Sequence, residues 1–197
     1  MQAPASKLTL QGTRTVVGAA EAEALISGIF LKLGCSRKAS AQVAQHLVDT
    51  SLCGMESHGI MRVLQYAEQM QSGYLDSKAE ARAFHDRRGV TRVEGGGGIG
   101  IRAMQLAYET GMQEARERGI SALSIRHAGH TGRHGAFADM AAEYGFPTIC
   151  IGGGNRKKWR QVAPYGGARA KLPTNPWCAG IPGGAQGPVV LDFATSK

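Results

Sequence analysis

The sequence predicts an α/β fold preceded by a helical segment. Apolar residues recur at helical spacing up to about residue 70, whereas short apolar runs alternate with helical patterns from about residue 79 onward. Strands that alternate with helices are typical of a sheet covered by helices. We therefore expect an N-terminal helical segment over residues 1–78 and an α/β region over residues 79–197.

Three helices are expected in the first segment. Ala19–Leu33 is rich in Ala, Glu and Leu at helical spacing, and Gly34 is a typical helix stop. Ser36 is suited to cap a second helix. The turn at residues 57–59 opens a third helix that ends near Met70.

The second segment combines short strands with two helices. A run of four glycines, Gly95–Gly98, precedes a helix over residues 101–118, and another helix covers residues 137–144. The strands are expected at residues 81–84, 90–93, 120–125, 147–151, 177–181 and 189–193.

The composition is that of a soluble globular protein. The chain has 197 residues, of which 43% are hydrophobic and 19% are charged. It has no long uncharged apolar run, and its first residues lack the apolar core of a signal peptide, so we expect a cytoplasmic protein without a membrane span. The four cysteines are scattered without a C-x-x-C pair, which argues against a zinc site or a disulfide framework.

The formal net charge of +8 points to an anionic partner. A nucleic acid is one alternative, because Arg156–Arg160 is a basic run that contains one aromatic residue. The other basic residues are spread out, and a solvated loop explains this run better. We therefore expect no nucleic-acid partner, and the positive field also suits small anions such as dinucleotides and carboxylic acids.

The stretch from Ser57 to Tyr66 carries the residues best suited to chemistry. In an α-helix, positions i, i+4 and i+8 share a face, so His58, Arg62 and Tyr66 are expected to point into one pocket. A proton carrier, a guanidinium and a phenol together suit a small substrate that bears a carboxylate. The alternative is that Ser57 caps the helix and His58 is a structural residue.

A glycine pattern, Gly95-x-Gly97-x-x-Gly100, formally matches the dinucleotide-binding fingerprint between a strand and a helix. The fingerprint also expects an acid at the end of the next strand, where this chain has Arg126-His127. An arginine there suits a phosphorylated ribose. The alternative is a tight turn that needs positive φ.

Three histidines follow the strand at residues 120–125. A zinc site is one explanation, but no nearby Asp, Glu or Cys completes a ligand set, so we expect no metal. Another is a general acid or base, because the ordinary histidine pKa of about 6.5 suits proton exchange near neutrality. We expect this role for His130, which lies between glycines, and expect His127 and His134 to cap or solvate the loop.

Six motifs follow one another along the chain. In order, they are Ser57-His58-Gly59-x-x-Arg62-x-x-x-Tyr66, the glycine run, Gly129-His130-x-Gly132, Val162-Ala163-Pro164-x-Gly166-Gly167, Thr174-Asn175-Pro176 and Leu191-Asp192-x-Ala194-Thr195-Ser196. Each of the last three, taken alone, is typical of a structural turn. The whole succession resembles the malate/L-lactate dehydrogenase type 2 family, over about residues 40–197.

The resemblance implies an NAD- or NADP-dependent oxidoreductase that interconverts a small 2-hydroxy acid and its 2-oxo acid. It also implies a homodimer and a mixed-sheet, non-Rossmann NAD(P)-binding domain of the sulfolactate dehydrogenase type. His58 or His130 is then the acid or base, and Ser57, Arg62 and Tyr66 bind the substrate. The residues expected to bind the cofactor are Thr174, Asn175, Asp192, Phe193 and Ala194.

Three features depart from the family pattern. Family members continue beyond the position of Lys197, so we expect this chain to be incomplete at its C-terminus relative to them. The alternative function is an inactive copy that only binds or dimerises. The loop at residues 152–161 is longer and more basic than usual, with Gly154 in place of a side chain, and Leu172-Pro173 stands where glycine is usual.

Overall fold

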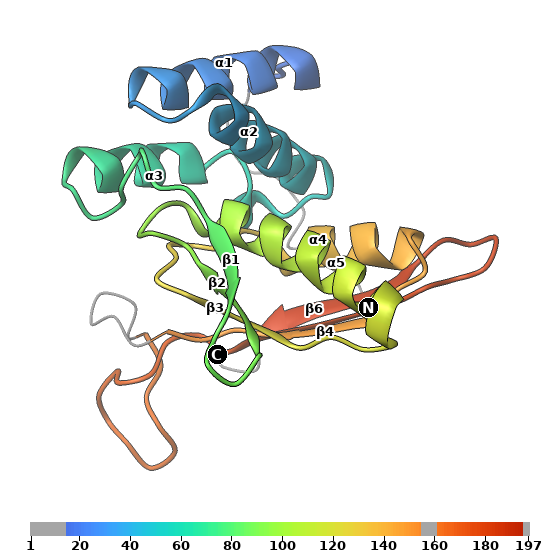
Figure 1. The fold of residues 1–197 in the computed structure, drawn as a ribbon. Coiled ribbons are helices and arrows are strands. Elements are labelled where there is room, and N and C mark those ends of the chain that lie inside the picture. Colours follow the sequence, from blue (N-terminus) through green and yellow to red (C-terminus); the bar gives the residue numbers. More distant parts are fainter. Residues whose placement is uncertain (1–14, 155–160, 195–197) are drawn as a thin grey trace, which may run out of the picture.

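The computed structural model describes residues 15–154 and 161–194 (Figure 1). The helices are α1 (Ala19–Lys32), α2 (Arg37–Leu52), the short 3-10 helix η1 (Glu56–His58), α3 (Arg62–Gln71), α4 (Gly100–Arg118) and α5 (His134–Glu143). The strands are β1 (Arg82–His85), β2 (Thr91–Glu94), β3 (Leu123–Arg126), β4 (Thr148–Ile151), β5 (Pro176–Ile181) and β6 (Val189–Ala194). None of the helices in these two ranges is long and apolar enough to span a membrane. The basic run at residues 156–160 and the Thr195-Ser196 end of the last motif lie outside the described residues.

Local signals set the ends of α1, α2 and α4. Gly34 adopts a φ of 96° just after α1, and Gly119 ends α4 with a φ of 83°. At the start of α2, the hydroxyl of Ser36 accepts a hydrogen bond from Ala39 N at 3.2 Å. The predicted caps and stops of these helices are confirmed.

The third helix begins later than expected. His58 belongs to η1, and α3 starts only at Arg62. Between them, a Cβ atom at Gly59 would collide with Ser51, whose hydroxyl accepts a hydrogen bond from Ile60 N at 3.0 Å. This close approach to the end of α2 separates the turn from the helix. The prediction that one helix face carries His58 together with Arg62 is therefore wrong.

The strands form two sheets. In the first, β1 pairs antiparallel with β2, and β2 pairs parallel with β3 across the crossover helix α4. In the second, β4, β5 and β6 are antiparallel in that order. The α/β class with a mixed sheet is confirmed, but a single sheet is not formed, because within the described ranges β3 pairs only with β2 and β4 only with β5.

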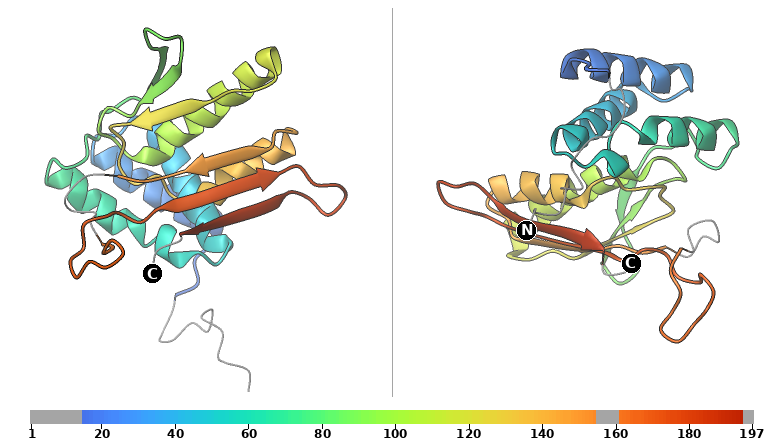
Figure 2. Two further views of the ribbon diagram at one scale, coloured as in Figure 1. Left: turned by 90° about the horizontal axis from the view of Figure 1, so that it is seen from below. Right: turned by 180° about the vertical axis from the view of Figure 1, so that it is seen from behind.

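The elements form layers. Helices α4 and α5 lie on one side of the two sheets, and α1, α2 and α3 form a further layer beyond them (Figures 1 and 2). The opposite faces of both sheets carry no helix from the described part of the chain. Each sheet is therefore covered on one face only.

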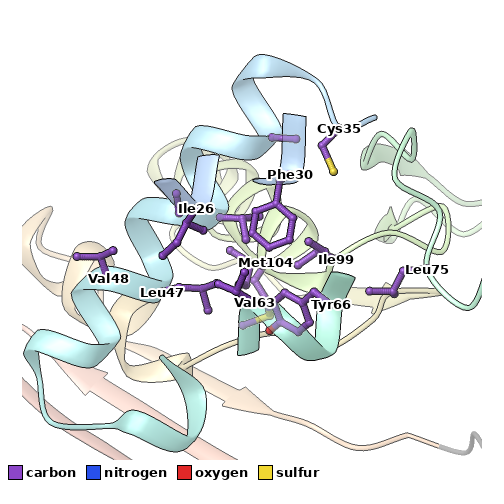
Figure 3. Close-up of a cluster of buried hydrophobic side chains, with 14 of the residues drawn as sticks. Ile26, Phe30, Cys35, Leu47, Val48, Val63, Tyr66, Leu75, Ile99 and Met104 are labelled. Atoms are coloured by element: carbon purple, nitrogen blue, oxygen red, sulfur yellow. The ribbon is translucent and has the colours of Figure 1, made fainter. Parts of the chain in front are cut away.

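The main hydrophobic core lies between the N-terminal helices and α4 (Figure 3). Phe30 of α1, Leu47 of α2 and Tyr66 of α3 are completely buried there, and Met104 of α4 is 2% exposed. This core holds α3, and therefore Tyr66, in a fixed position relative to α4. The division into segments at residues 78 and 79 stays a prediction.

Candidate active site

His130 is the centre of a polar cluster between α3 and the loop that precedes α5. Its Nδ1 atom lies 2.6 Å from the hydroxyl of Tyr66 and 3.3 Å from the backbone nitrogen of Gly132. A backbone N–H can only donate, so Nδ1 is an acceptor and carries no proton. The Tyr66 hydroxyl therefore also donates to Nδ1, and the neutral imidazole of His130 has its proton on Nε2.

His58 lies beside His130, with the two ring centroids 5.1 Å apart. Its Nδ1 atom is 2.9 Å from the hydroxyl of Ser57. Because a serine hydroxyl can donate or accept, either tautomer of His58 keeps this hydrogen bond. His58 can therefore present a lone pair or a proton at Nε2, whereas His130 presents a proton.

Arg62 is held against the turn that carries His58. Its Nε atom donates a hydrogen bond to the carbonyl oxygen of Ser57 at 2.6 Å. Its Nη1 atom donates to the side-chain oxygen of Gln65. These two bonds fix the plane of the guanidinium close to both histidines.

Burial and positive charge keep the two histidines neutral. Burial lowers the pKa of His130 to about 3, and the charges of Arg62 and of a protonated His58 act in the same direction. Burial and Arg62 also lower the pKa of His58, while Asp192 opposes them. Burial raises the pKa of Tyr66 far above its ordinary value, so this phenol stays protonated as a donor.

The other two histidines of the loop have different environments. His127 has 58% of its side chain exposed, and its Nδ1 lies 2.9 Å from Glu94 Oε1, as expected of a solvated residue. His134 is only 5% exposed, with Nε2 at 2.8 Å from the Thr131 hydroxyl and Nδ1 at 3.7 Å from Cys150 Sγ. We expected His134 to cap or solvate the loop. It does not solvate the loop, because the first turn of α5 directs this side chain inward toward β4, but its hydrogen bond to Thr131 does connect it to the loop.

His46, on α2, holds the same loop from the other side. Its Nε2 accepts a hydrogen bond from Arg133 N at 3.0 Å, and its ring stacks on Phe137 with centroids 5.0 Å apart. Gly132 has a φ of 73°, and a Cβ atom there would collide with the His46 ring. The segment that carries His130 is therefore tightly packed.

Asp192 connects the last strand to this cluster. Its Oδ2 accepts a hydrogen bond from Gly135 N at 2.6 Å, in the first turn of α5. A carboxylate is favoured there by the positive end of the helix dipole. The Asp192 charge also raises the pKa of His134 and of His58, against the effect of their burial.

The glycine-rich loop packs against the histidine loop. Gly97 N donates to the carbonyl of His127 at 2.7 Å, and Gly100 N donates to the carbonyl of His130 at 3.0 Å. A Cβ atom at Gly100 would lie 2.8 Å from Thr131 Cγ2. The backbone N–H groups that would bind a phosphate are used for this contact. The interpretation as a tight turn is therefore favoured over the dinucleotide fingerprint.

An open cleft of about 1350 Å³ runs past the cluster. Of the residues predicted for the site, the cleft is lined by His58, His130, Thr174, Asp192, Phe193 and Ala194. Ser57, Arg62 and Tyr66 are not among the lining residues, and each is hydrogen-bonded to one of the two histidines or to the turn of His58. Asn175 is not among the lining residues.

One residue of the cluster, His46, was missed from the sequence, and the burial of His134 was not expected. His46 lies on the same helical face as Val43, Leu47 and Thr50, which are all buried. That spacing is a signal for a buried position. His134 has a similar signal, because it lies on one helical face with Ala138 and Ala141, which are also buried. The expected start of this helix at residue 137 left His134 outside it.

The chain matches a known family over almost its whole length. Residues 17–197 fit the family model described as malate/L-lactate dehydrogenase. The chain belongs to this family. It is 29% identical over 175 residues to hydroxycarboxylate dehydrogenase B of Escherichia coli (strain K12), a match that covers 87% of this chain and 47% of that protein. It is 33% identical over 172 residues to malate dehydrogenase of Pyrococcus abyssi, covering 85% and 45% of the two chains.

Solved structures confirm the α/β fold of this family. The malate dehydrogenase structure from Pyrococcus horikoshii OT3 has a TM-score of 0.83 at 29% identity, covering 92% of this chain and 51% of that one. The sulfolactate dehydrogenase structure from Methanocaldococcus jannaschii has a TM-score of 0.82 at 25% identity, with the same coverage of 92% and 51%. The chain thus spans about half the length of the relatives it matches.

Proposed function

We propose that this chain carries the proton-transfer and substrate-binding residues of a dehydrogenase that interconverts a small 2-hydroxy acid and its 2-oxo acid with NAD or NADP. The observation that carries this proposal is the placement of His58 next to a Tyr66-bound His130 on the wall of a large cleft. Relatives named malate dehydrogenase, L-lactate dehydrogenase and hydroxycarboxylate dehydrogenase support it.

The hydrogen bonds divide the proton chemistry between the two histidines. Nδ1 of His130 receives two donors, so this residue offers its Nε2–H as a hydrogen-bond donor to the reacting oxygen. His58 can donate Nδ1–H to Ser57 and present a lone pair at Nε2. His58 is therefore the group that takes the hydroxyl proton during oxidation and returns it during reduction.

We assign the substrate carboxylate to Arg62, which does not itself line the cleft but is hydrogen-bonded to the turn that carries His58, a lining residue. Its bonds to Ser57 and Gln65 hold the guanidinium in one orientation, so a carboxylate bound by its other N–H groups is oriented as well. Tyr66 is fully buried and acts through His130. It is a positioning residue, which modifies the prediction that it binds the substrate directly.

The part of the cleft beside β6 fits a nicotinamide cofactor. Thr174, Phe193 and Ala194 line the cleft that also contains both histidines. Its volume of about 1350 Å³ exceeds the roughly 300–1,000 Å³ of common small-molecule pockets, so there is room for a dinucleotide and a substrate. When bound, the cofactor supplies hydride exchange at C2 of the substrate. The glycine loop takes no part in this site, and the role of Asn175 stays a prediction.

A second candidate is a binding or dimerising module without catalysis. It is favoured by the exposed apolar side chains of Ile149 and Ile151, at 70% and 73%, which are typical of a contact with another chain. In both cases we propose a homodimer in the cytoplasm.

The test is turnover with malate, lactate, ureidoglycolate and sulfolactate, each with NAD and with NADP, followed at the nicotinamide absorbance band. His58→Gln is expected to lower kcat about 10²- to 10⁴-fold. Arg62→Lys is expected to raise KM, and Arg92→Lys, on the first sheet, is the matched control. Cofactor binding without turnover on any of the substrates would favour the second candidate. The absence of both cofactor binding and turnover would contradict both candidates.

A further inference from the structure

Cys150 of β4 and Cys178 of β5 are directly opposite each other in the second sheet. Gly152 N donates a hydrogen bond to Pro176 O at 2.9 Å, so the pair two residues away, Cys150 and Cys178, is also a hydrogen-bonded pair of the ladder. The Cα atoms of such a pair lie about 5.5 Å apart, and disulfides join Cα atoms that lie about 4.4–6.8 Å apart. The backbone spacing therefore allows a bond between the two sulfur atoms.

Both thiol side chains lie between the second sheet and α5. Directly opposite residues of antiparallel strands point to the same face of the sheet. Cys178 is completely buried, and the Sγ atom of Cys150 lies 3.7 Å from Nδ1 of His134, in the first turn of α5. Gly180 shares this face, and a Cβ atom there would lie 2.9 Å from Ala138 of α5. The helix therefore holds the two sulfur atoms on one packed layer (Figure 2).

The two thiols differ in their access to small molecules. Cys150 lines the cleft, whereas Cys178 is not among the lining residues. The other two cysteines, Cys35 and Cys53, lie at the two ends of α2 and outside this sheet. A reagent in the cleft therefore meets Cys150 first, and Cys178 is reached only through Cys150.

His134 is placed to take a proton from Cys150. Its Nδ1 atom faces the Cys150 sulfur, and its Nε2 atom lies 2.8 Å from the hydroxyl of Thr131. Burial lowers the pKa of His134, so its ring is neutral and can accept a proton, and the charge of Asp192 stabilises the imidazolium. Burial raises the pKa of the Cys150 thiol, and raises that of Cys178 to about 12. Because the thiolate is the reactive form, Cys150 needs this base.

We propose that Cys150 and Cys178 form a reversible disulfide in response to a hydroperoxide, with Cys150 reacting first and His134 taking its proton. In the first step the Cys150 thiolate attacks one oxygen of hydrogen peroxide, the O–O bond breaks, and the departing hydroxide takes the proton from His134 to give water. Cys150 is then a sulfenic acid, which condenses with a thiol. In the second step the Cys178 sulfur attacks the Cys150 sulfur, the S–O bond breaks, and the hydroxyl leaves with the Cys178 proton as a second water. The two thiols lose two electrons, and the peroxide gains them.

The strand geometry makes this disulfide easy to reduce. The Cβ atoms of directly opposite residues lie about 4.5–5.5 Å apart, against about 3.5–4.5 Å in a disulfide, so the two strands must draw together when the bond forms. Disulfides that form under such a constraint are the labile, regulatory ones. In a compartment that keeps thiols reduced, such a pair is a transient redox sensor. This role agrees with cysteine spacing that does not indicate a structural disulfide framework.

Oxidation of this pair reaches the loop that carries His130. The new bond draws the Cys150 sulfur toward Cys178 and away from His134. His134 then loses one of its two polar contacts, and the other is to Thr131, the residue next to His130. The redox state of the pair therefore changes the support of the candidate active site. This inference goes beyond the proposed function, since the disulfide forms without turnover.

The test uses the 197-residue chain with Cys53→Ser, which removes the exposed thiol. The chain is treated with hydrogen peroxide, the remaining thiols are alkylated, and the peptides are identified by mass spectrometry. We expect a linked peptide pair that contains Cys150 and Cys178, with Cys35 alkylated, and we expect dithiothreitol to release the link. The absence of this linked pair, or a link that joins two chains, would overturn the proposal.

Substitutions test the order of the two steps. Cys178→Ala should leave Cys150 as a sulfenic acid that dimedone traps, and Cys150→Ala should leave Cys178 unoxidised. His134→Gln should slow disulfide formation at least about tenfold, because the base is lost. His127→Gln, which replaces an exposed histidine of the same loop, is the matched control. Equal rates in these two variants, or a dimedone adduct on Cys178 instead of Cys150, would overturn the assigned order.

The linked peptide also separates this inference from the proposed reaction. A reversible Cys150–Cys178 disulfide in a chain without turnover on any substrate would support the inference while contradicting the proposed function. In a chain with turnover, oxidation should change the rate and dithiothreitol should restore it, whereas Cys178→Ala should abolish the recovery-linked disulfide signal. Turnover in a chain that never forms the link would overturn the inference alone.

Discussion

The hydroxyl of Tyr66 lies 2.6 Å from Nδ1 of His130, although the two residues are 64 positions apart. Tyr66 is anchored in the main core, whereas His130 lies on a loop at the cleft. The core therefore sets the tautomer of a histidine at the candidate site.

Tyr66→Phe should raise the pKa of His130 above about 3, because a hydroxyl that donates to Nδ1 stabilises the neutral imidazole. Burial, the largest cause of the low pKa, and the charge of Arg62 remain, so the pKa should stay below its ordinary value. The measurement is an NMR titration of the His130 ring proton. Tyr108→Phe is the control, since Tyr108 packs on Phe137. An equal shift in both variants would contradict this role for Tyr66.

The buried histidines should make stability depend on pH. The pKa of His46 is lowered to about 4 and that of His130 to about 3, against 6.5 in an unfolded chain. Between these values and 6.5 the unfolded state binds more protons, so the free energy of unfolding should fall as the pH is lowered through this range. Each such histidine contributes a slope of up to about 1.4 kcal/mol per pH unit.

Urea unfolding at several pH values between about 7 and 5 checks this slope. Histidine in an unfolded chain takes up its proton in this pH range. His46→Gln should flatten it relative to His127→Gln, which replaces an exposed histidine. A profile that does not change with pH would show that these imidazoles are not buried in solution.

Asp192 is predicted to have two separable effects. Asp192→Ala removes the acceptor for Gly135 N and should cost about 1 kcal/mol of stability. Asp192→Asn retains an acceptor oxygen and should cost less. Both variants remove the charge that raises the pKa of His58 and His134, so both should lower these pKa values further. Denaturation and histidine NMR titrations measure the two effects separately.

Gly100 should tolerate no side chain. In Gly100→Ala the new Cβ would lie 2.8 Å from Thr131 Cγ2 and 2.9 Å from the His130 carbonyl, and we expect a loss of about 1–3 kcal/mol. Gly28→Ala is the control: it lies inside α1 with open space around it, and should stabilise the chain by about 0.5–1 kcal/mol. If both variants unfold at the same urea concentration, the close packing of the glycine loop is not present in solution.

Most element boundaries could be predicted because their causes are local. The cap at Ser36 and the stops at Gly34 and Gly119 act within a few residues of the chain, and all three have the expected geometry. The start of α3 could not be predicted in this way. It depends on the contact of Gly59 with Ser51, which belongs to another helix.

The candidate site also combines features that the local sequence indicates with features that depend on distant contacts. The glycines around His130 and the Ser57–Tyr66 motif indicated which side chains to consider, and His58 and Tyr66 do contact His130. The inward position of His134 depends on Cys150 of β4, and the role of His46 depends on its hydrogen bond to Arg133. Helical spacing marks both positions as buried. Which groups these histidines bind depends on contacts between distant segments, and the local sequence does not contain them.

The contact between the glycine loop and the histidine loop has a further consequence. The N–H groups of Gly97 and Gly100 bind the carbonyls of His127 and His130 and so set the distance between the start of α4 and the candidate site. In this chain the G-x-G-x-x-G pattern therefore acts as a spacer between two loops. Substitution of these glycines should displace His130, whose carbonyl accepts from Gly100 N, and leave the hydrogen bond between His58 and Ser57 unchanged.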